Sequence, residues 1–95
     1  MKSLASLILE EKYLIDELNR LKDALELYKC EKEKIRKTIN SGTEDLYVLV
    51  SDYLKYRFAV NELLTEMVEK KIQLKSTRFE MKQYFKEILK KMRES

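Results

Sequence analysis

Five charged residues interrupt the apolar repeat of this chain, and they are the first candidates for chemistry: Glu11, Lys32, Arg57, Lys71 and Arg78. Charges in a helical core either converge on a cavity or each meet an opposite charge and set the register of helix pairing. Histidine is absent and cysteine occurs once, so the side chains of ordinary zinc sites are missing. A single glycine excludes a phosphate-binding loop. We therefore expect no metal, no cofactor and no catalytic residue.

One short segment raises an enzymatic alternative. Residues 12–16, Lys-Tyr-Leu-Ile-Asp, resemble the start of the first helix of dimeric all-helical chorismate mutases, which use Arg and Lys at a bundle core. The resemblance covers five residues and has a lysine where that family has an arginine. It implies a small mutase-like enzyme in which Arg57, Lys71 and Arg78 converge on a cavity. We favour the interpretation that these charges set register, and we expect no catalysis.

Residues 40–44, Asn-Ser-Gly-Thr-Glu, are the one place where a long helical pattern stops and starts again. Gly42 is the only glycine and suits the C-terminal end of a helix, where a positive φ is needed. For the start of the next helix two alternatives stay open: Thr43 as N-cap, or a capping box of Ser41 and Glu44. Because the connection is short in either case, the flanking helices are expected to pack antiparallel.

The chain is thus predicted to be one all-α domain, 1–95, with a helix at 3–40, a turn at 41–43 and a helix at 44–93. Heptad repeats indicate a long antiparallel helical hairpin of the coiled-coil type. In the first helix every d position is apolar: Leu7, Leu14, Leu21, Tyr28 and Ile35. In the second helix the d positions are Leu46, Tyr53, Val60, Met67, Leu74, Met81 and Ile88. The a positions of the second helix, expected to face the partner as well, are Val50, Arg57, Leu64, Lys71, Arg78, Phe85 and Met92.

The interrupting charges are opposite in sign where the two helices meet. In a hairpin centred near residue 42, residue i lies opposite roughly residue 84 − i. Glu11 is then within reach of Lys71 and Arg78. This complementarity favours the hairpin.

The first helix alone also fits a rival arrangement. In a parallel homodimer, Glu17–Lys22 and Glu31–Arg36 pairs would flank the seam. Exposed pairs of this kind contribute little to stability. The parallel dimer therefore stays a rival to the hairpin, in which Lys32 comes level with Asp52.

The second helix has more apolar surface than one neighbour can cover, which indicates a partner interface. Residues from about 81 onward extend past the start of the first helix. The predicted interface residues are Leu49, Leu54, Tyr56, Phe58, Leu63, Val68, Ile72, Phe79, Met81, Phe85, Ile88 and Met92. We expect self-association to a dimer that completes a four-helix bundle. The alternatives are a different helical protein as partner, or a monomer whose second helix breaks at 73–77 and folds back as a third helix.

The C-terminal end is basic, because residues 69–95 hold nine Lys/Arg and four Asp/Glu. We expect the basic side chains to spread around the helix as solvated charges. An acidic protein, nucleic acid and an anionic membrane follow as partners, in that order. A nucleic-acid-binding arm made by this helix is thus the alternative function, possible in principle but not favoured.

The sequence places the chain in the cytoplasm by default. No run of eighteen apolar residues is present, the N-terminus does not fit a signal peptide, and Cys30 is the only cysteine. The function predicted from the residues is a non-enzymatic protein–protein interaction module: a small coiled-coil chaperone, adaptor or structural subunit.

Overall fold

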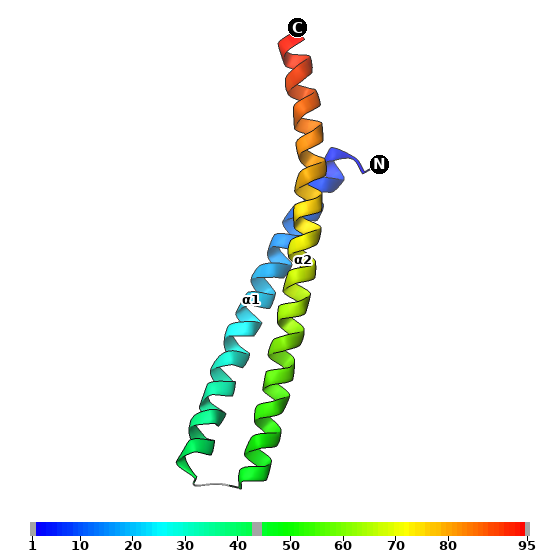
Figure 1. The fold of residues 1–95 in the computed structure, drawn as a ribbon. Helices are drawn as coiled ribbons and strands as arrows, with labels where there is room; N and C mark the ends of the chain where they lie inside the picture. Colours follow the sequence, from blue (N-terminus) through cyan, green and yellow to red (C-terminus); the bar gives the residue numbers. More distant parts are fainter. Residues whose placement is uncertain (1, 43–44, 95) are drawn as a thin grey trace. The chain divides into compact units, whose positions relative to one another are not determined.

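The computed structural model describes residues 2–42 and 45–94, and these residues form two α-helices and no strand. Helix α1 spans Leu4–Ser41 and helix α2 spans Leu46–Glu94. The two helices run antiparallel on either side of the turn, so the predicted all-α helical hairpin is confirmed (Figure 1). Because α2 is unbroken, the alternative in which it breaks at 73–77 is wrong.

Hydrogen bonds at the ends of α1 explain where it begins and ends. The Ser6 backbone N–H donates to the Ser3 hydroxyl at 3.1 Å, so Ser3 is the N-cap. Gly42 follows the last helical residue with a φ of 68°, and its N–H donates to the Ile39 carbonyl at 3.2 Å. The predicted role of Gly42 as the left-handed residue that ends the first helix is confirmed.

The N-cap of α2 is Asp45. Its carboxylate accepts a 2.9 Å hydrogen bond from the backbone N–H of Tyr47, the second residue of the helix. The two predicted alternatives placed the cap earlier. Thr43 and Glu44 lie outside the described residues, and Ser41 is the last residue of α1.

The chain divides into two compact units, each made of a segment of α1 and a segment of α2. The terminal unit contains residues 1–19 and 68–95, and the turn unit contains residues 20–67. The buried side chains of the terminal unit are Leu7, Leu14, Leu74, Thr77 and Met81. Those of the turn unit are Leu21, Leu25, Leu49 and Val60.

Contacts in both units agree with a hairpin centred near Gly42. In the turn unit, Tyr28 and Tyr56 lie fourteen residues on either side of Gly42, and their ring centroids are 5.9 Å apart. In the terminal unit, the Lys70 ammonium lies 5.7 Å from the centre of the Tyr13 ring. The predicted pairing of the two helices is therefore confirmed within each unit.

The face of α2 that packs in the hairpin differs from the predicted face by one column of residues. The d column is inside, as Val60 and Leu74 show. The second inner column, however, is Leu49, Tyr56, Leu63, Lys70, Thr77 and Tyr84, and the predicted a column is exposed. The physical reason is charge: the a column contains Arg57, Lys71 and Arg78, whose burial would be costly. The column one residue earlier contains only Lys70 in this stretch, and its ammonium remains near the Tyr13 ring.

Candidate interaction surfaces

Four of the twelve side chains predicted to contact a partner lie in the inner columns of the hairpin. Leu49 and Met81 are buried, and Tyr56 and Leu63 are half-buried. Because Met81 is only 7% exposed, the bare segment of α2 begins later than the predicted residue 81. Large exposed apolar side chains start again at Phe85.

The other eight predicted interface residues are on the surface, between 43% and 66% exposed: Leu54 and Phe58 in the turn unit, and Val68, Ile72, Phe79, Phe85, Ile88 and Met92 in the terminal unit. The structure thus leaves most of the predicted interface accessible. That these residues contact a partner stays a prediction.

In the turn unit, α2 carries a second apolar face, which we call the outer stripe. It is formed by Tyr47, Val50, Leu54, Phe58 and Leu64, which are 83%, 39%, 53%, 65% and 40% exposed. Most of these follow one another at intervals of three or four residues, the spacing of one helix face. The sequence interpretation missed part of this stripe, because it assigned Val50 and Leu64 to the inner seam and did not consider Tyr47.

A shallow depression lies at the middle of the outer stripe. It is lined by Leu54, Arg57, Phe58 and Asn61, all from α2. Arg57, predicted to face the core, therefore lies at the surface beside two apolar side chains of the stripe. The depression thus combines apolar side chains with one cation and one amide.

One of the predicted charge contacts is present. The Arg78 Nε donates to a Glu11 carboxylate oxygen at 3.0 Å, so the expected meeting of these two charges is confirmed. Lys71 is exposed and makes no ion pair with Glu11. Arg78 meets a carboxylate within the terminal unit, which is the arrangement expected of a charge pair between helices.

The second predicted charge contact is not made. Lys32 and Asp52 are both half-buried, and no ion pair joins them in the part of the chain that the structure describes. That these charges set the register of the helices stays a prediction.

The rival parallel homodimer predicted for the first helix is not the arrangement observed, because α1 packs against α2. Two of its predicted pairing residues have partners within α1. Glu31 pairs with Lys34 at 3.2 Å, and Arg36 with Glu33 at 3.6 Å. The hydrogen bond to Glu31 raises the pKa of Lys34 above its ordinary value.

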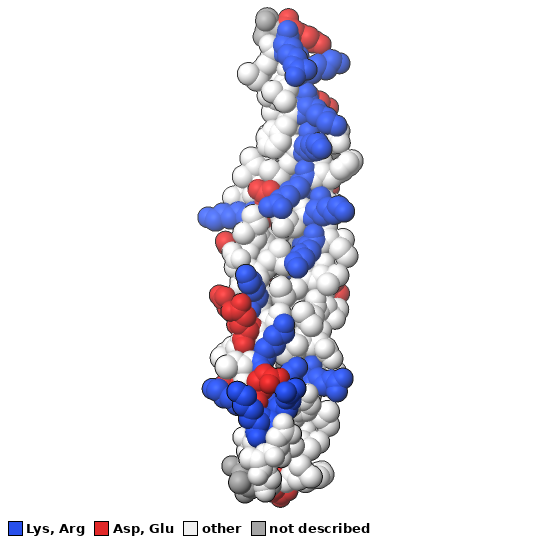
Figure 2. Space-filling view, turned by 60° about the vertical axis from the view of Figure 1, so that its left-hand side comes forward, with Lys and Arg blue, Asp and Glu red and all other residues white. Residues whose placement is uncertain are grey.

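The C-terminal half of α2 has a basic face. At about 100° per residue, seven of its nine basic residues fall within an arc of about 120°. They are Lys71, Lys75, Arg78, Lys82, Lys86, Lys90 and Arg93, all exposed. Figure 2 shows Lys and Arg side chains in a nearly continuous line along the upper part of the view. Lys70 and Lys91 lie outside this arc, so the prediction that the basic residues spread around this helix is wrong for the other seven.

The acidic residues of the same segment are gathered on a different face of the helix. Glu69, Glu80, Glu87 and Glu94 fall within an arc of about 40°, whose centre lies about 120° around the helix from the centre of the basic face. The number of glutamates alone suggested that they dilute the basic charge, but their positions place them off the basic face. The spacing of the charged residues in the sequence indicates this separation, whereas a count of charges does not.

A polar cluster ties the start of the chain to α2 within the terminal unit. The Tyr84 hydroxyl donates to the Lys2 carbonyl, and the Lys2 ammonium forms a 2.7 Å ion pair with Glu10. The hydrogen bond from Lys2 lowers the pKa of Glu10, and a hydrogen bond with the Thr77 hydroxyl lowers it further. The same hydrogen bond to Glu10 raises the pKa of Lys2.

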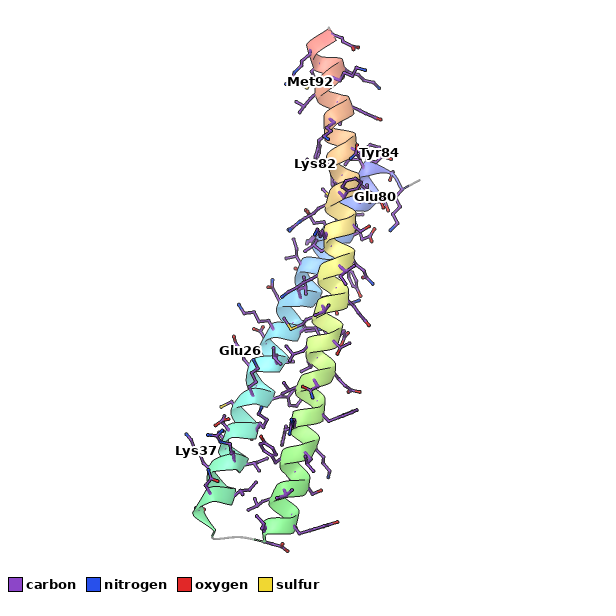
Figure 3. The ribbon with its side chains drawn as sticks, in the orientation of Figure 1. Glu26, Lys37, Glu80, Lys82, Tyr84 and Met92 are labelled. Atoms are coloured by element: carbon purple, nitrogen blue, oxygen red, sulfur yellow. The ribbon has the colours of Figure 1, made fainter. Side chains whose placement is uncertain are left out.

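Figure 3 shows the consequence of this cluster for the residues of α2. Glu80 and Tyr84 lie on the side of the helix toward the start of α1, and Lys82 lies on the opposite side. Near Tyr84, α2 passes the start of α1. The C-terminal segment of α2, residues 82–94, is called the overhang below.

Among the described residues, no group of three His, Cys, Asp or Glu side chains could hold a metal ion. Neither helix has a stretch long and apolar enough to cross a membrane, within the same residues. Comparison of the chain with protein-family models, curated proteins and solved structures finds no match.

Proposed function

We propose that this chain is a non-enzymatic protein–protein interaction module, of the kind that serves as a coiled-coil chaperone, adaptor or structural subunit. Its first partner is a second copy of itself, bound through the outer stripe. The observation that supports this best is the exposure of Tyr47, Leu54 and Phe58 on a helix whose other face is already packed. A helix with one neighbour needs one apolar stripe, and α2 in the turn unit has two.

Charge complementarity supports a second copy as the occupant. Lys55 and Glu62 lie seven residues apart on one flank of the outer stripe. When two α2 helices pack antiparallel about a twofold axis near Phe58, Lys55 of each copy faces Glu62 of the other. The same pairing sets Leu54 against Leu64. Two hairpins joined in this way form a four-helix bundle.

Light scattering over a range of protein concentrations tests the proposal. We expect a dimer mass for the unmodified chain and a monomer mass for Phe58→Glu, because replacing a large apolar side chain by a carboxylate removes apolar contact and makes burial of the stripe costly. Leu27→Glu is the matched control, since Leu27 lies on α1 of the same unit and is 62% exposed, close to the 65% of Phe58. A monomer at every concentration would refute self-association. Equal effects of the two substitutions would refute the outer stripe as the site.

The orientation of the pair is tested by exchanging charges. Lys55→Glu alone places two carboxylates opposite each other and should weaken the dimer. Adding Glu62→Lys restores the attraction with the signs reversed and should recover the dimer mass. A parallel pair would instead set opposite flanks of the two helices against each other, so Lys55 and Glu62 would not meet, and neither the loss in Lys55→Glu nor the recovery on adding Glu62→Lys would be observed.

A cytoplasmic location is part of the same proposal. The thiol of Cys30 is exposed. Free exposed thiols persist in reducing compartments, whereas oxidising ones favour disulfides. Detection of a Cys30–Cys30 disulfide in protein isolated from its native cells under thiol-blocking conditions would contradict this location.

A further inference from the structure

The overhang combines an apolar surface with a basic one. Phe85, Ile88 and Leu89 are 45%, 43% and 52% exposed, and Met92 is 66% exposed. These residues follow Tyr84, whose hydroxyl donates a hydrogen bond to the Lys2 carbonyl near the start of the chain. Their exposure contrasts with Met81, one turn earlier, which is 7% exposed.

The two surfaces adjoin on the helix. At 100° per residue, the four apolar side chains occupy an arc of about 100°. Lys82, Lys86, Lys90 and Arg93 occupy the next arc of about 80°. The glutamates of the overhang lie beyond this basic arc, away from the apolar side chains. Lys91, the remaining basic residue of the overhang, falls on the acidic side, about 40° around the helix from Glu87. Apart from Lys91, the order around the helix is apolar, basic and acidic, and in Figure 3 Lys82 and Met92 project from the same side of α2.

We infer that the overhang binds the surface of a membrane rich in anionic lipids. The helix lies in the plane of the interface, with Phe85 and Leu89 among the acyl chains and the lysines at the lipid phosphates. Helices bind anionic bilayers in this way when an apolar face is joined to basic residues. The acidic arc, with Glu87, remains in water. This site is separate from the outer stripe and does not depend on self-association.

Two other occupants fit the overhang less well. In an antiparallel pair of overhangs, the same flank of each helix meets, so Lys86 of one copy would face Lys90 of the other. Like charges at that distance repel. A nucleic acid would neutralise the lysines but would leave Phe85, Ile88 and Leu89 in water, because phosphates offer no apolar surface. A bilayer of anionic lipids covers both arcs.

Sedimentation with vesicles tests this inference on the full chain. The probes are vesicles of phosphatidylcholine alone, and vesicles in which roughly one third of the lipid is phosphatidylserine, which gives a negative surface potential. We expect binding to the anionic vesicles, and binding at least tenfold weaker to the neutral ones. Equal binding to both would overturn the role of the basic arc, and absence of binding to either would overturn the inference.

Two variants separate the contributions. Lys82→Gln, Lys86→Gln and Lys90→Gln together should weaken binding on the order of a hundredfold, from about fivefold per lysine near an anionic surface. The matched control removes the same charge from α1, by Lys22→Gln, Lys29→Gln and Lys37→Gln, and should retain the binding. Similar losses in both triple variants would mean that net charge rather than the overhang is responsible, and would overturn the inference.

Phe85→Ser with Leu89→Ser distinguishes a membrane from a soluble polyanion. This variant should lose at least tenfold in vesicle binding while keeping its helical circular dichroism, because both side chains are about half exposed. Unchanged vesicle binding, or binding of duplex DNA or polyglutamate as tight as that of anionic vesicles, would overturn the membrane as the occupant. A fall from dimer to monomer mass in this variant would show that a second copy covers the overhang. That result would also overturn the membrane as the occupant.

Discussion

The adjacent residues Leu63 and Leu64 give the sharpest test of which face of α2 packs inside the hairpin. Leu63 is half-buried in the inner column, whereas Leu64 is 40% exposed. Truncation of a packed leucine to alanine costs about 2 to 3 kcal/mol at such a site, and truncation of an exposed one about 0.5 to 1 kcal/mol. A chain of this size has a free energy of unfolding of roughly 5 to 14 kcal/mol, so the difference is measurable. Urea unfolding followed by circular dichroism gives both values.

Protein concentration separates the hairpin from the proposed dimer in the same experiment. The loss in Leu63→Ala should be the same in dilute and concentrated samples, because the contact is within one chain. The loss in Leu64→Ala should grow with concentration, because Leu64 belongs to the outer stripe and contributes when a second copy binds. If Leu64→Ala lowers the free energy of unfolding more than Leu63→Ala in dilute samples, α2 packs with the a column, which contains Leu64, inside the hairpin. The assignment of the inner column would then be refuted.

Three further predictions concern the turn and the charges of the terminal unit. Gly42→Ala should lower the free energy of unfolding by about 1 to 2 kcal/mol in urea unfolding, because an added Cβ meets no atom within 4 Å and the cost comes from the positive φ alone. A double-mutant cycle of Arg78→Ala and Glu11→Ala should give a coupling of about 0.2 to 1 kcal/mol that shrinks in high salt, since both side chains are partly exposed; a zero coupling in low salt would contradict the contact. The pKa of Glu10 is lowered by Lys2, so its contribution to stability is present above its ordinary pKa near 4.5 and is lost as the pH falls through the lower folded value. Unfolding measured from pH 6 to pH 2 should therefore show a smaller acid-induced loss in Glu10→Gln than in the unmodified chain.

The hairpin could be predicted from the sequence because its signals are local. Gly42 is the only glycine, and the helical pattern restarts after it. The helix then fixes the approximate level of each residue, which is why the meeting of Glu11 and Arg78 could be anticipated. The rotation of α2 about its own axis was not predicted correctly. Leu63 and Leu64 are the same residue type, and only the cost of burying Arg57 and its neighbours decides between their two columns.

The basic face could be predicted from the spacing of the lysines in the sequence, but not from their number. A net charge weighs Glu87 against Lys86 wherever each side chain points. On a continuous helix these two neighbours lie about 100° apart, so they belong to different faces. The continuity of α2 through residues 73–77, which the sequence left open, is what makes this spacing meaningful over the whole segment.

The chemistry of α2 changes along its length, and this makes the two proposed surfaces separable. Residues 46–68 hold two Lys/Arg and three Asp/Glu beside the outer stripe, whereas residues 69–95 hold nine and four. Replacing Lys82, Lys86 and Lys90 with glutamine should therefore leave the dimer mass and its concentration dependence unchanged. Conversely, Phe58→Glu should still bind anionic vesicles, with a salt dependence similar to that of the unmodified chain. Loss of both activities in Phe58→Glu, with helicity intact, would mean that one surface serves both and that the apolar residues of the overhang do not act alone.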